Sequence, residues 1–167
     1  GAIRWTADLP GFPERWIYCS PVTGHQGKSG ADVIYAGSNA GWGAFDGGTG
    51  ANLWYHSFVG NAPRIIDKPS RARAMISGDL LIALIPKRGL VALDRKVGDM
   101  VWERPLAVQH YWATPVVTED LIITGGDPGM LTLIQAGTGE LVNEWPLDGD
   151  YPVGLEVVEG SCYVGFP

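Results

Sequence analysis

Residues 44–54 read AFDGGTGANLW and residues 92–102 read ALDRKVGDMVW, so both stretches fit the pattern A-x-D-x-x-[TV]-G-x-x-[LV]-W. A third stretch, residues 133–143 (LIQAGTGELVN), keeps the Thr-Gly pair but has Gln and Asn in place of Asp and Trp. Residues 1–5 (GAIRW) match the last five positions of the pattern. The glycine therefore recurs at positions 1, 50, 98 and 139, and these spacings of 49, 48 and 41 residues are typical of one four-stranded propeller blade per repeat.

The residues of the pattern have a physical role in a tight turn between two strands. Asp46 can accept hydrogen bonds from the backbone amides of its own turn, and Gly50 can adopt the positive φ that such a turn requires. Trp54 adds a large apolar ring and one N–H donor to the outer strand, where it can pack against the next blade. The second stretch repeats all three positions at Asp94, Gly98 and Trp102.

The composition supports an all-β chain. The 167 residues include 24 Gly and 12 Pro, and no segment free of both is longer than nine residues. Ordinary helices average about 11 to 12 residues, so helical architectures are excluded. Apolar residues make up 46% of the chain and charged residues 18%, which is enough apolar material to bury a core.

The repeats divide the chain into blades. We expect complete blades at residues 16–60, 70–108 and 110–148, with four strands in each. In the first blade, strands are expected near 17–23, 32–37, 41–46 and 51–59, with a surface loop over 24–30. Residues 1–9 are expected to form the outer strand of a preceding blade, and residues 151–167 the two inner strands of a further blade.

Charge, hydropathy and cysteine content exclude several classes of function. The net charge of −6 argues against nucleic acid as a partner, because phosphate binding needs a broad basic surface. No apolar run approaches the ~20 residues that span a bilayer, so no membrane span is expected. Cys19 and Cys162 are too few for a disulfide framework, although they leave open a single bridge.

The two full stretches resemble the tryptophan-docking repeat of the quinoprotein-like, or PQQ-repeat, β-propellers. This family includes the pyrroloquinoline quinone (PQQ) dehydrogenases and the outer-membrane assembly lipoprotein BamB. The resemblance implies a ring of eight four-stranded antiparallel blades, of which this chain provides about half. It also implies a periplasmic or extracellular location in the cell envelope.

A half ring needs completion. In a four-stranded meander the second and fourth strands run parallel, so the ends of one chain cannot pair through a short hairpin within a single blade. Two sources of the missing strands are considered. One is the remaining blades of a longer chain, and the other is a second copy that forms a homodimer.

Residues that could carry catalysis are scarce. The chain has no G-x-S-x-G, H-E-x-x-H or P-loop motif. The PQQ dehydrogenases to which the chain is similar commonly carry a vicinal Cys-Cys pair and a calcium site, and this chain has no vicinal cysteines. We therefore expect no catalytic residues, no metal site and no cofactor, with PQQ and calcium required only if the chain is a fragment of such an enzyme.

The inner strands offer the best candidate for ligand binding. When the repeats are aligned on the aspartates at 32, 79 and 120, two sets of three residues fall at equivalent positions two residues apart. Inner strands line the central channel of a propeller, and aromatic and arginine side chains there suit a planar or anionic ligand or a peptide. An alternative is that the arginines lie in a solvated loop and the aromatic rings pack in the core. The candidate residues are Tyr18, Arg71 and Trp112 at the first position, and Ser20, Arg73 and Thr114 at the second.

Three functions are compatible with these observations. The first is a non-catalytic scaffold or binding module for a protein or peptide partner, which we favour because blade packing explains every strong motif. The second is a fragment of a PQQ-dependent alcohol or sugar dehydrogenase. The third is the sensor or accessory propeller of a larger envelope protein.

Overall fold

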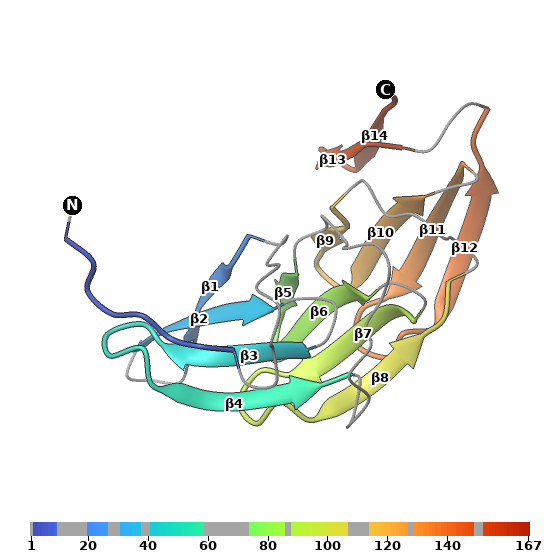
Figure 1. Ribbon diagram of the computed structural model, residues 1–167. Coiled ribbons are helices and arrows are strands. Elements are labelled where there is room, and N and C mark those ends of the chain that lie inside the picture. Colours follow the sequence, from blue (N-terminus) through green and yellow to red (C-terminus); the bar gives the residue numbers. More distant parts are fainter. Residues whose placement is uncertain are drawn as a thin grey trace.

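The computed structural model of the chain consists of β-sheets arranged side by side (Figure 1). It describes residues 2–9, 20–26, 31–37, 41–58, 74–85, 88–106, 114–126, 129–148 and 152–167. Within these ranges there are three four-stranded antiparallel sheets and one two-stranded hairpin, and no residue is helical. The all-β prediction is therefore confirmed, and the sheets resemble propeller blades.

Each four-stranded sheet is a simple meander in which neighbouring strands are consecutive in the sequence. The first sheet contains β1 (Val22–Gln26), β2 (Ala31–Gly37), β3 (Gly41–Asp46) and β4 (Asn52–Ser57). The second contains β5 (Met75–Ser77), β6 (Leu80–Ile85), β7 (Gly89–Asp94) and β8 (Met100–Arg104). The third contains β9 (Val116–Thr118), β10 (Leu121–Gly126), β11 (Met130–Gln135) and β12 (Leu141–Pro146). The C-terminal hairpin contains β13 (Gly154–Val158) and β14 (Ser161–Gly165).

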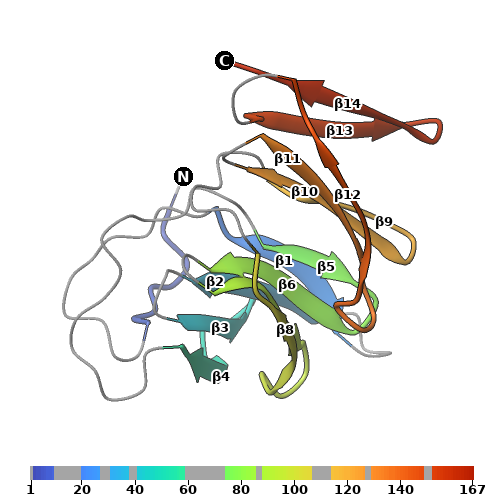
Figure 2. The same ribbon diagram turned by 90° about the vertical axis from the view of Figure 1, so that its right-hand side faces the viewer.

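The first strands of the sheets lie next to one another. β5 contacts both β1 and β9, and β9 contacts β13. The last strands, β4, β8 and β12, run along the outer margin of the array (Figure 1). Figure 2 shows the C-terminal hairpin stacked on the third sheet. The sheets therefore fan out from a common inner side formed by their first strands, as the blades of a propeller do.

The core lies between the sheets because alternate residues of each strand point to opposite faces. Tyr35 of the first sheet packs with Leu81 and Leu93 of the second in one buried cluster. Ile82, the next residue along β6, packs with Ile122 of the third sheet in another. All of β6 from Leu81 to Ile85 is buried, since both faces of the second sheet are covered.

The structure differs from the expected local structure at two places. Residues 2–9 are not in a strand, and the described residues include no third strand of a preceding sheet that could pair with them, so their place as the outer strand of a preceding blade stays a prediction. Residues 24–26 of the expected loop over 24–30 belong to β1, because β1 and β2 stay paired as far as His25–Asp32 and Gln26–Ala31, and residues 27–30 lie outside the described residues. The Nδ1 atom of His25 lies 2.9 Å from the Oδ1 atom of Asp32 across this pair.

Candidate functional site

The structure describes only two of the six residues predicted to line the channel. Ser20 is exposed and Thr114 is half-buried, and both lie just before the inner strand of their sheet. Strand register supports their equivalence. Ser20 comes two residues before Val22, which pairs with Tyr35, and Thr114 comes two residues before Val116, which pairs with Ile123. Tyr35 and Ile123 each lie three residues after an aligned aspartate, at positions 32 and 120. The other four, Tyr18, Arg71, Arg73 and Trp112, lie outside the described residues. A shared binding surface stays a prediction.

The turn after β3 is built around the carboxylate of Asp46. Its Oδ1 atom accepts hydrogen bonds from the amides of Gly48 (3.1 Å) and Thr49 (2.7 Å) and from the Thr49 hydroxyl (2.8 Å). In the second sheet Asp94 accepts from the amides of Lys96 (2.7 Å) and Val97 (3.2 Å). The predicted role of the two aspartates is therefore confirmed.

We expect the Thr49 hydroxyl to keep the Asp46 carboxylate ionised at unusually low pH. Its hydrogen bond is the first cause that lowers the pKa of Asp46 below 3.8, followed by the Thr49 and Gly48 amides. Because the folded-state pKa is lowered, this contribution to stability is present above about pH 3.8 and is lost as pH falls through the folded pKa. Thr49→Val, which gives this turn the residue found at Val97, should raise the pKa of Asp46 in a carboxyl NMR titration. An unchanged pKa would show that the hydroxyl has no such role.

The tryptophans of the repeat join residues 2–9 to the first sheet, the first sheet to the second, and the second sheet to the third. Each ring packs over the glycine of the following turn and donates its indole N–H to a backbone carbonyl of that turn. The donor–acceptor pairs are Trp5 to Gly47 (3.0 Å), Trp54 to Arg95 (2.9 Å) and Trp102 to Ala136 (3.0 Å). The glycines under the rings are Gly50, Gly98 and Gly139, with φ of +75°, +80° and +74°. At the fourth such position stands Asn143, which instead accepts a hydrogen bond from the Glu144 amide.

Sequence reasoning missed an arginine between the first two sheets. Arg95 donates to the carbonyls of Gly78 (2.7 Å) and His25 (2.8 Å), and its guanidinium lies 5.6 Å from the centroid of the Tyr35 ring. The only sequence feature that could have pointed to Arg95 is an arginine directly after Asp94, where the other two stretches carry Gly47 and Ala136. The contacts are structural, since they cross-link the sheets.

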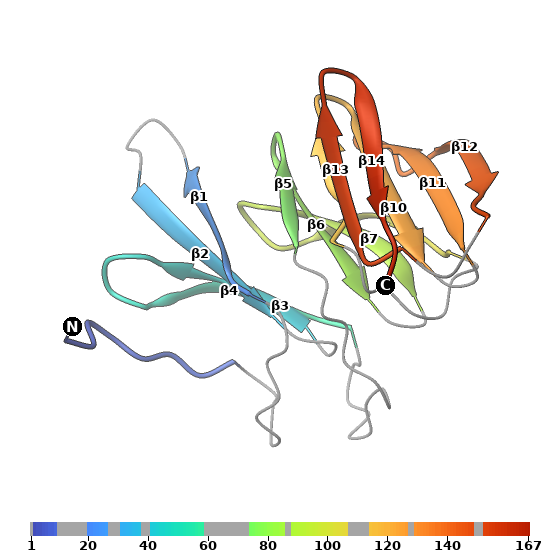
Figure 3. The same cartoon turned by 90° about the horizontal axis from the view of Figure 1, so that it is seen from above.

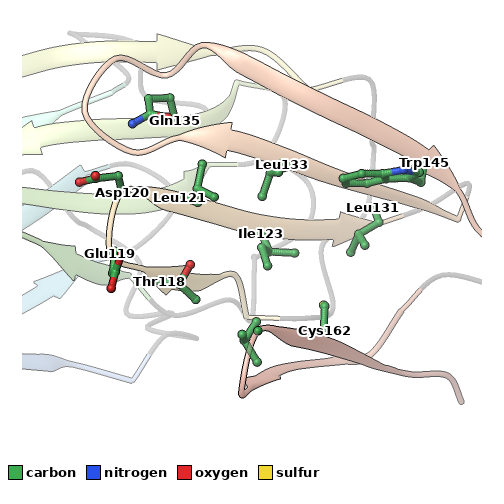
Figure 4. Close-up of a pocket in the computed structure, with 12 residues that line it drawn as sticks. Thr118, Glu119, Asp120, Leu121, Ile123, Leu131, Leu133, Gln135, Trp145 and Cys162 are labelled. Atoms are coloured by element: carbon green, nitrogen blue, oxygen red, sulfur yellow. The ribbon is translucent and has the colours of Figure 1, made fainter.

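A groove of about 780 Å³ separates the third sheet from the C-terminal hairpin (Figure 4). Its apolar lining consists of Leu121, Ile123, Leu131, Leu133, Trp145 and Val157. Thr118, Glu119, Asp120 and Gln135 lie toward one end, and Cys162 and Gly160 come from the hairpin. The surface is thus apolar along most of its length with two carboxylates at one end.

The groove exists because the third sheet is covered less than the others. Strand register places Leu131 where Trp42 lies in the first sheet and Leu90 in the second. Trp42 and Leu90 are 1% and 0% exposed, whereas Leu131 is half-buried and Trp145 on the neighbouring strand is 42% exposed. The described residues supply only β13 and β14 to cover this face.

Metal-ligating side chains do not gather in the described residues. No three His, Cys, Asp or Glu side chains come together within the described ranges. Cys162 is an exposed residue and is not in a disulfide. Desolvation of its sulfur by neighbouring atoms raises the pKa of the thiol. Cys19 lies outside the described residues. No membrane-crossing helix occurs in the described part of the chain.

Comparison with known proteins places these features in a family. The model of the family described as outer membrane protein assembly factor BamB matches residues 1–164. A comparison with curated protein sequences finds no match.

Several solved structures share the fold. BamB from Moraxella catarrhalis is 23% identical with a TM-score of 0.62, over 89% of this chain and 43% of that one. The computationally designed Ika4 protein is 12% identical with a TM-score of 0.65, over 95% of both chains. The quinohemoprotein alcohol dehydrogenase ADHIIG from Pseudomonas putida HK5 is 18% identical with a TM-score of 0.59, over 87% of this chain and 21% of that one. The chain thus spans less than half the length of the BamB structure, and at these identities the likeness shows the fold alone.

Proposed function

The chain belongs to the family of the outer membrane protein assembly factor BamB, and from this premise we propose that it is a non-catalytic β-propeller scaffold that binds a protein or peptide partner in the cell envelope. The observation that carries the proposal is that the repeated residues serve packing. The aspartates close turns, and the tryptophans lock each sheet onto the next. These packing roles of the aspartates and tryptophans support a scaffold.

The proposed partner site lies where the inner strands begin. Ser20 and Thr114 come just before β1 and β9, and these two strands lie along the inner side of the array. Arg71, Arg73 and Trp112 fall at equivalent sequence positions. Guanidinium groups beside aromatic rings can hold an acidic or aromatic peptide through charge-assisted hydrogen bonds and stacking. The periplasmic or extracellular location belongs to the same proposal.

The alternative is a fragment of a PQQ-dependent dehydrogenase. The fold likeness to the quinohemoprotein alcohol dehydrogenase motivates it. Against it stands the sequence, in which Cys19 and Cys162 are the only cysteines and are not adjacent. This alternative makes a different experimental prediction, so one set of assays separates the two.

We expect the chain to bind peptides and not to bind PQQ. On an array of ten-residue extended peptides, the wild-type chain should bind a subset rich in acidic and aromatic residues. The paired change Arg71→Ser with Arg73→Ser should weaken that binding about tenfold or more, since hydrogen bonds to charged groups contribute about 1.5–3 kcal/mol each. The matched control is Lys96→Ser, which removes an exposed positive charge on the turn beyond β7.

The enzyme alternative is tested on the same preparation. With PQQ and Ca²⁺ added, the proposed scaffold gives no dye reduction with alcohols or sugars and no quenching of tryptophan fluorescence by PQQ. Dye-linked oxidation that depends on both additions would overturn the proposal in favour of the dehydrogenase. Peptide binding that the arginine changes leave unaltered would remove the inner-strand site.

A further inference from the structure

Each of the three four-stranded sheets has a β-bulge in its outer strand, and the extra residue of each bulge is apolar. The register of the third and fourth strands skips one residue at this point, and a bulge leaves such a residue unpaired. The skipped residues are Leu53, Val101 and Val142, which are 49%, 51% and 51% exposed. Single exposed apolar residues are ordinary on protein surfaces, but here the same position is apolar and exposed in all three sheets.

The exposure of this position does not result from a missing neighbour. The second sheet packs against a four-stranded sheet on each side, and Val101 is as exposed there as its counterparts are in the other two sheets. Two more large apolar residues of the second sheet are exposed next to this bulge, Val97 at 58% and Met100 at 45%. We call the five residues the apolar rim, because they follow the turns and outer strands at the margin of the array (Figure 1): Leu53, Val97, Met100, Val101 and Val142.

The apolar rim lies beside an acidic end of the array. Backbone hydrogen bonds of 2.7–2.9 Å join the turn before each fourth strand to the turn after the first strand of the same sheet, with the donor–acceptor pairs Gly47–Asp32, Arg95–Asp79 and Ala136–Asp120. Figure 3 shows the turns after β5, β9 and β13 on the same side of the array. The described parts of all these turns contain nine Asp or Glu residues and two Lys or Arg residues.

The two cations of this end are engaged within the turns. The Nζ atom of Lys96 lies 3.3 Å from the Oδ2 atom of Asp79, and Arg95 donates to backbone carbonyls. Nine carboxylates and two cations leave a charge of −7 in these described turns, compared with −6 for the whole chain. Asp99 and Glu140 are exposed and directly precede β8 and β12, so both carboxylates lie within two residues of a bulge residue.

We propose that the apolar rim binds a segment of a partner protein that carries both apolar and basic side chains. Its apolar side chains cover the bulge residues, and removal of this area from water supplies affinity. Its lysine or arginine side chains approach Asp99 and Glu140, and the negative charge of the turns steers basic partners and disfavours acidic ones. A bulge interrupts the regular edge of a strand, so side chains hold the segment rather than strand addition.

This inference stands apart from the proposed function. The proposed inner-strand site lies where β1 and β9 begin, whereas the acidic turns follow these strands at the other end of the sheets. The partners also differ in charge, because the arginines of the inner-strand site suit acidic peptides and the acidic turns suit basic ones.

The test is fluorescence anisotropy with three labelled twelve-residue peptides, which alternate lysine with leucine, lysine with serine, or glutamate with leucine. Such a peptide spans about 40 Å when extended, more than the ~10 Å between stacked sheets. The lysine–leucine peptide should bind at least tenfold more tightly than the other two, and its affinity should fall as salt rises. Absence of lysine–leucine binding would overturn the proposal. Equal binding of the two lysine peptides would also overturn it, because charge alone would then explain the attraction.

Two paired variants locate the contact. Val97→Ser with Val101→Ser should weaken lysine–leucine binding about tenfold, because it removes exposed apolar area from the rim. Asp99→Asn with Glu140→Gln should weaken the same binding and reduce its dependence on salt. Unchanged affinity in either paired variant would show that the peptide binds elsewhere and would contradict the proposal.

Matched controls come from the other end of the sheets. Val153→Ser and Asp148→Asn change exposed residues just before β13 and just after β12, and both should keep wild-type affinity for the lysine–leucine peptide. Arg71→Ser with Arg73→Ser, which tests the inner-strand site, should also leave this binding unchanged, so the two proposals can fail separately. Circular dichroism checks that every variant keeps the fold.

Discussion

Replacing Trp54 with alanine is expected to lower the free energy of unfolding by about 3–5 kcal/mol, the usual range for removal of a packed large aromatic side chain. The ring is 8% exposed and lies between two sheets, with its centroid 6.0 Å from that of Tyr35. Its indole N–H donates to the carbonyl of Arg95 at 2.9 Å. The substitution therefore removes the apolar ring and leaves that carbonyl without this donor.

The measurement is urea unfolding followed by circular dichroism at one fixed protein concentration. Trp54→Phe serves as the control, because it keeps an aromatic ring in the contact while removing the N–H donor and part of the ring surface. We expect it to cost less than Trp54→Ala, with about 1 kcal/mol from the lost hydrogen bond and the rest from the lost ring surface. A loss below about 1 kcal/mol for Trp54→Ala would show that the ring does not join the sheets.

The eleven-residue pattern predicts the joints between sheets well because each of its positions meets a local physical requirement. The turn needs a side-chain acceptor at Asp46 and a positive φ at Gly50, and both requirements act within a few residues of sequence. The same pattern marks where one sheet ends and the next begins, so the all-β fold and the four-stranded meanders could be predicted from the sequence. Sequence similarity alone could not show which carbonyl each indole N–H would reach.

Predictions that depended on partners distant in the sequence were less successful. Residues 2–9 have the sequence of an outer strand, but a strand forms only where a neighbour offers backbone hydrogen bonds. Arg95 was missed because its partners, Gly78 and His25, lie on turns of two different sheets. The groove was missed because it depends on how the β13–β14 hairpin lies against the third sheet, which no local residue pattern encodes.

The candidate binding site shows the limit of alignment by repeats. Strand register supports placing Ser20 and Thr114 at equivalent positions, which the aspartate alignment predicted. Equivalence along the inner strands does not by itself bring side chains together at a ligand. That step depends on the segments carrying Arg71 and Trp112, so the peptide-binding assay with the arginine variants is the decisive measurement.

Replacing Gly98 with alanine is expected to cost about 2–5 kcal/mol, because two separate penalties add at this position. Gly98 has φ of +80°, and a side chain held in the left-handed region costs about 1–2 kcal/mol. A Cβ atom there would also lie 2.5 Å from the Trp54 ring, and overpacking of this kind costs a further 1–3 kcal/mol.

Alanine substitutions at two other glycines measure the conformational penalty without the contact penalty. Gly78, in the same sheet, has φ of +53°, and Gly160 has φ of +77°, and neither has an atom within 4 Å of the place its Cβ would occupy. Alanine at either position should therefore cost only the conformational ~1–2 kcal/mol. Equal losses at Gly78, Gly98 and Gly160 in urea unfolding would show that the ring does not press on the turn.

The double-mutant cycle of Gly98→Ala with Trp54→Ala isolates the contact itself. Once the ring is gone, the alanine at position 98 no longer meets the three nearest atoms, all of which belong to Trp54, and its cost should fall toward the level seen at Gly78. We expect a coupling free energy of about 1–3 kcal/mol, in the range measured for residues in direct contact. Additive losses would mean that ring and glycine act independently, which would contradict the account of how each sheet is locked to the next.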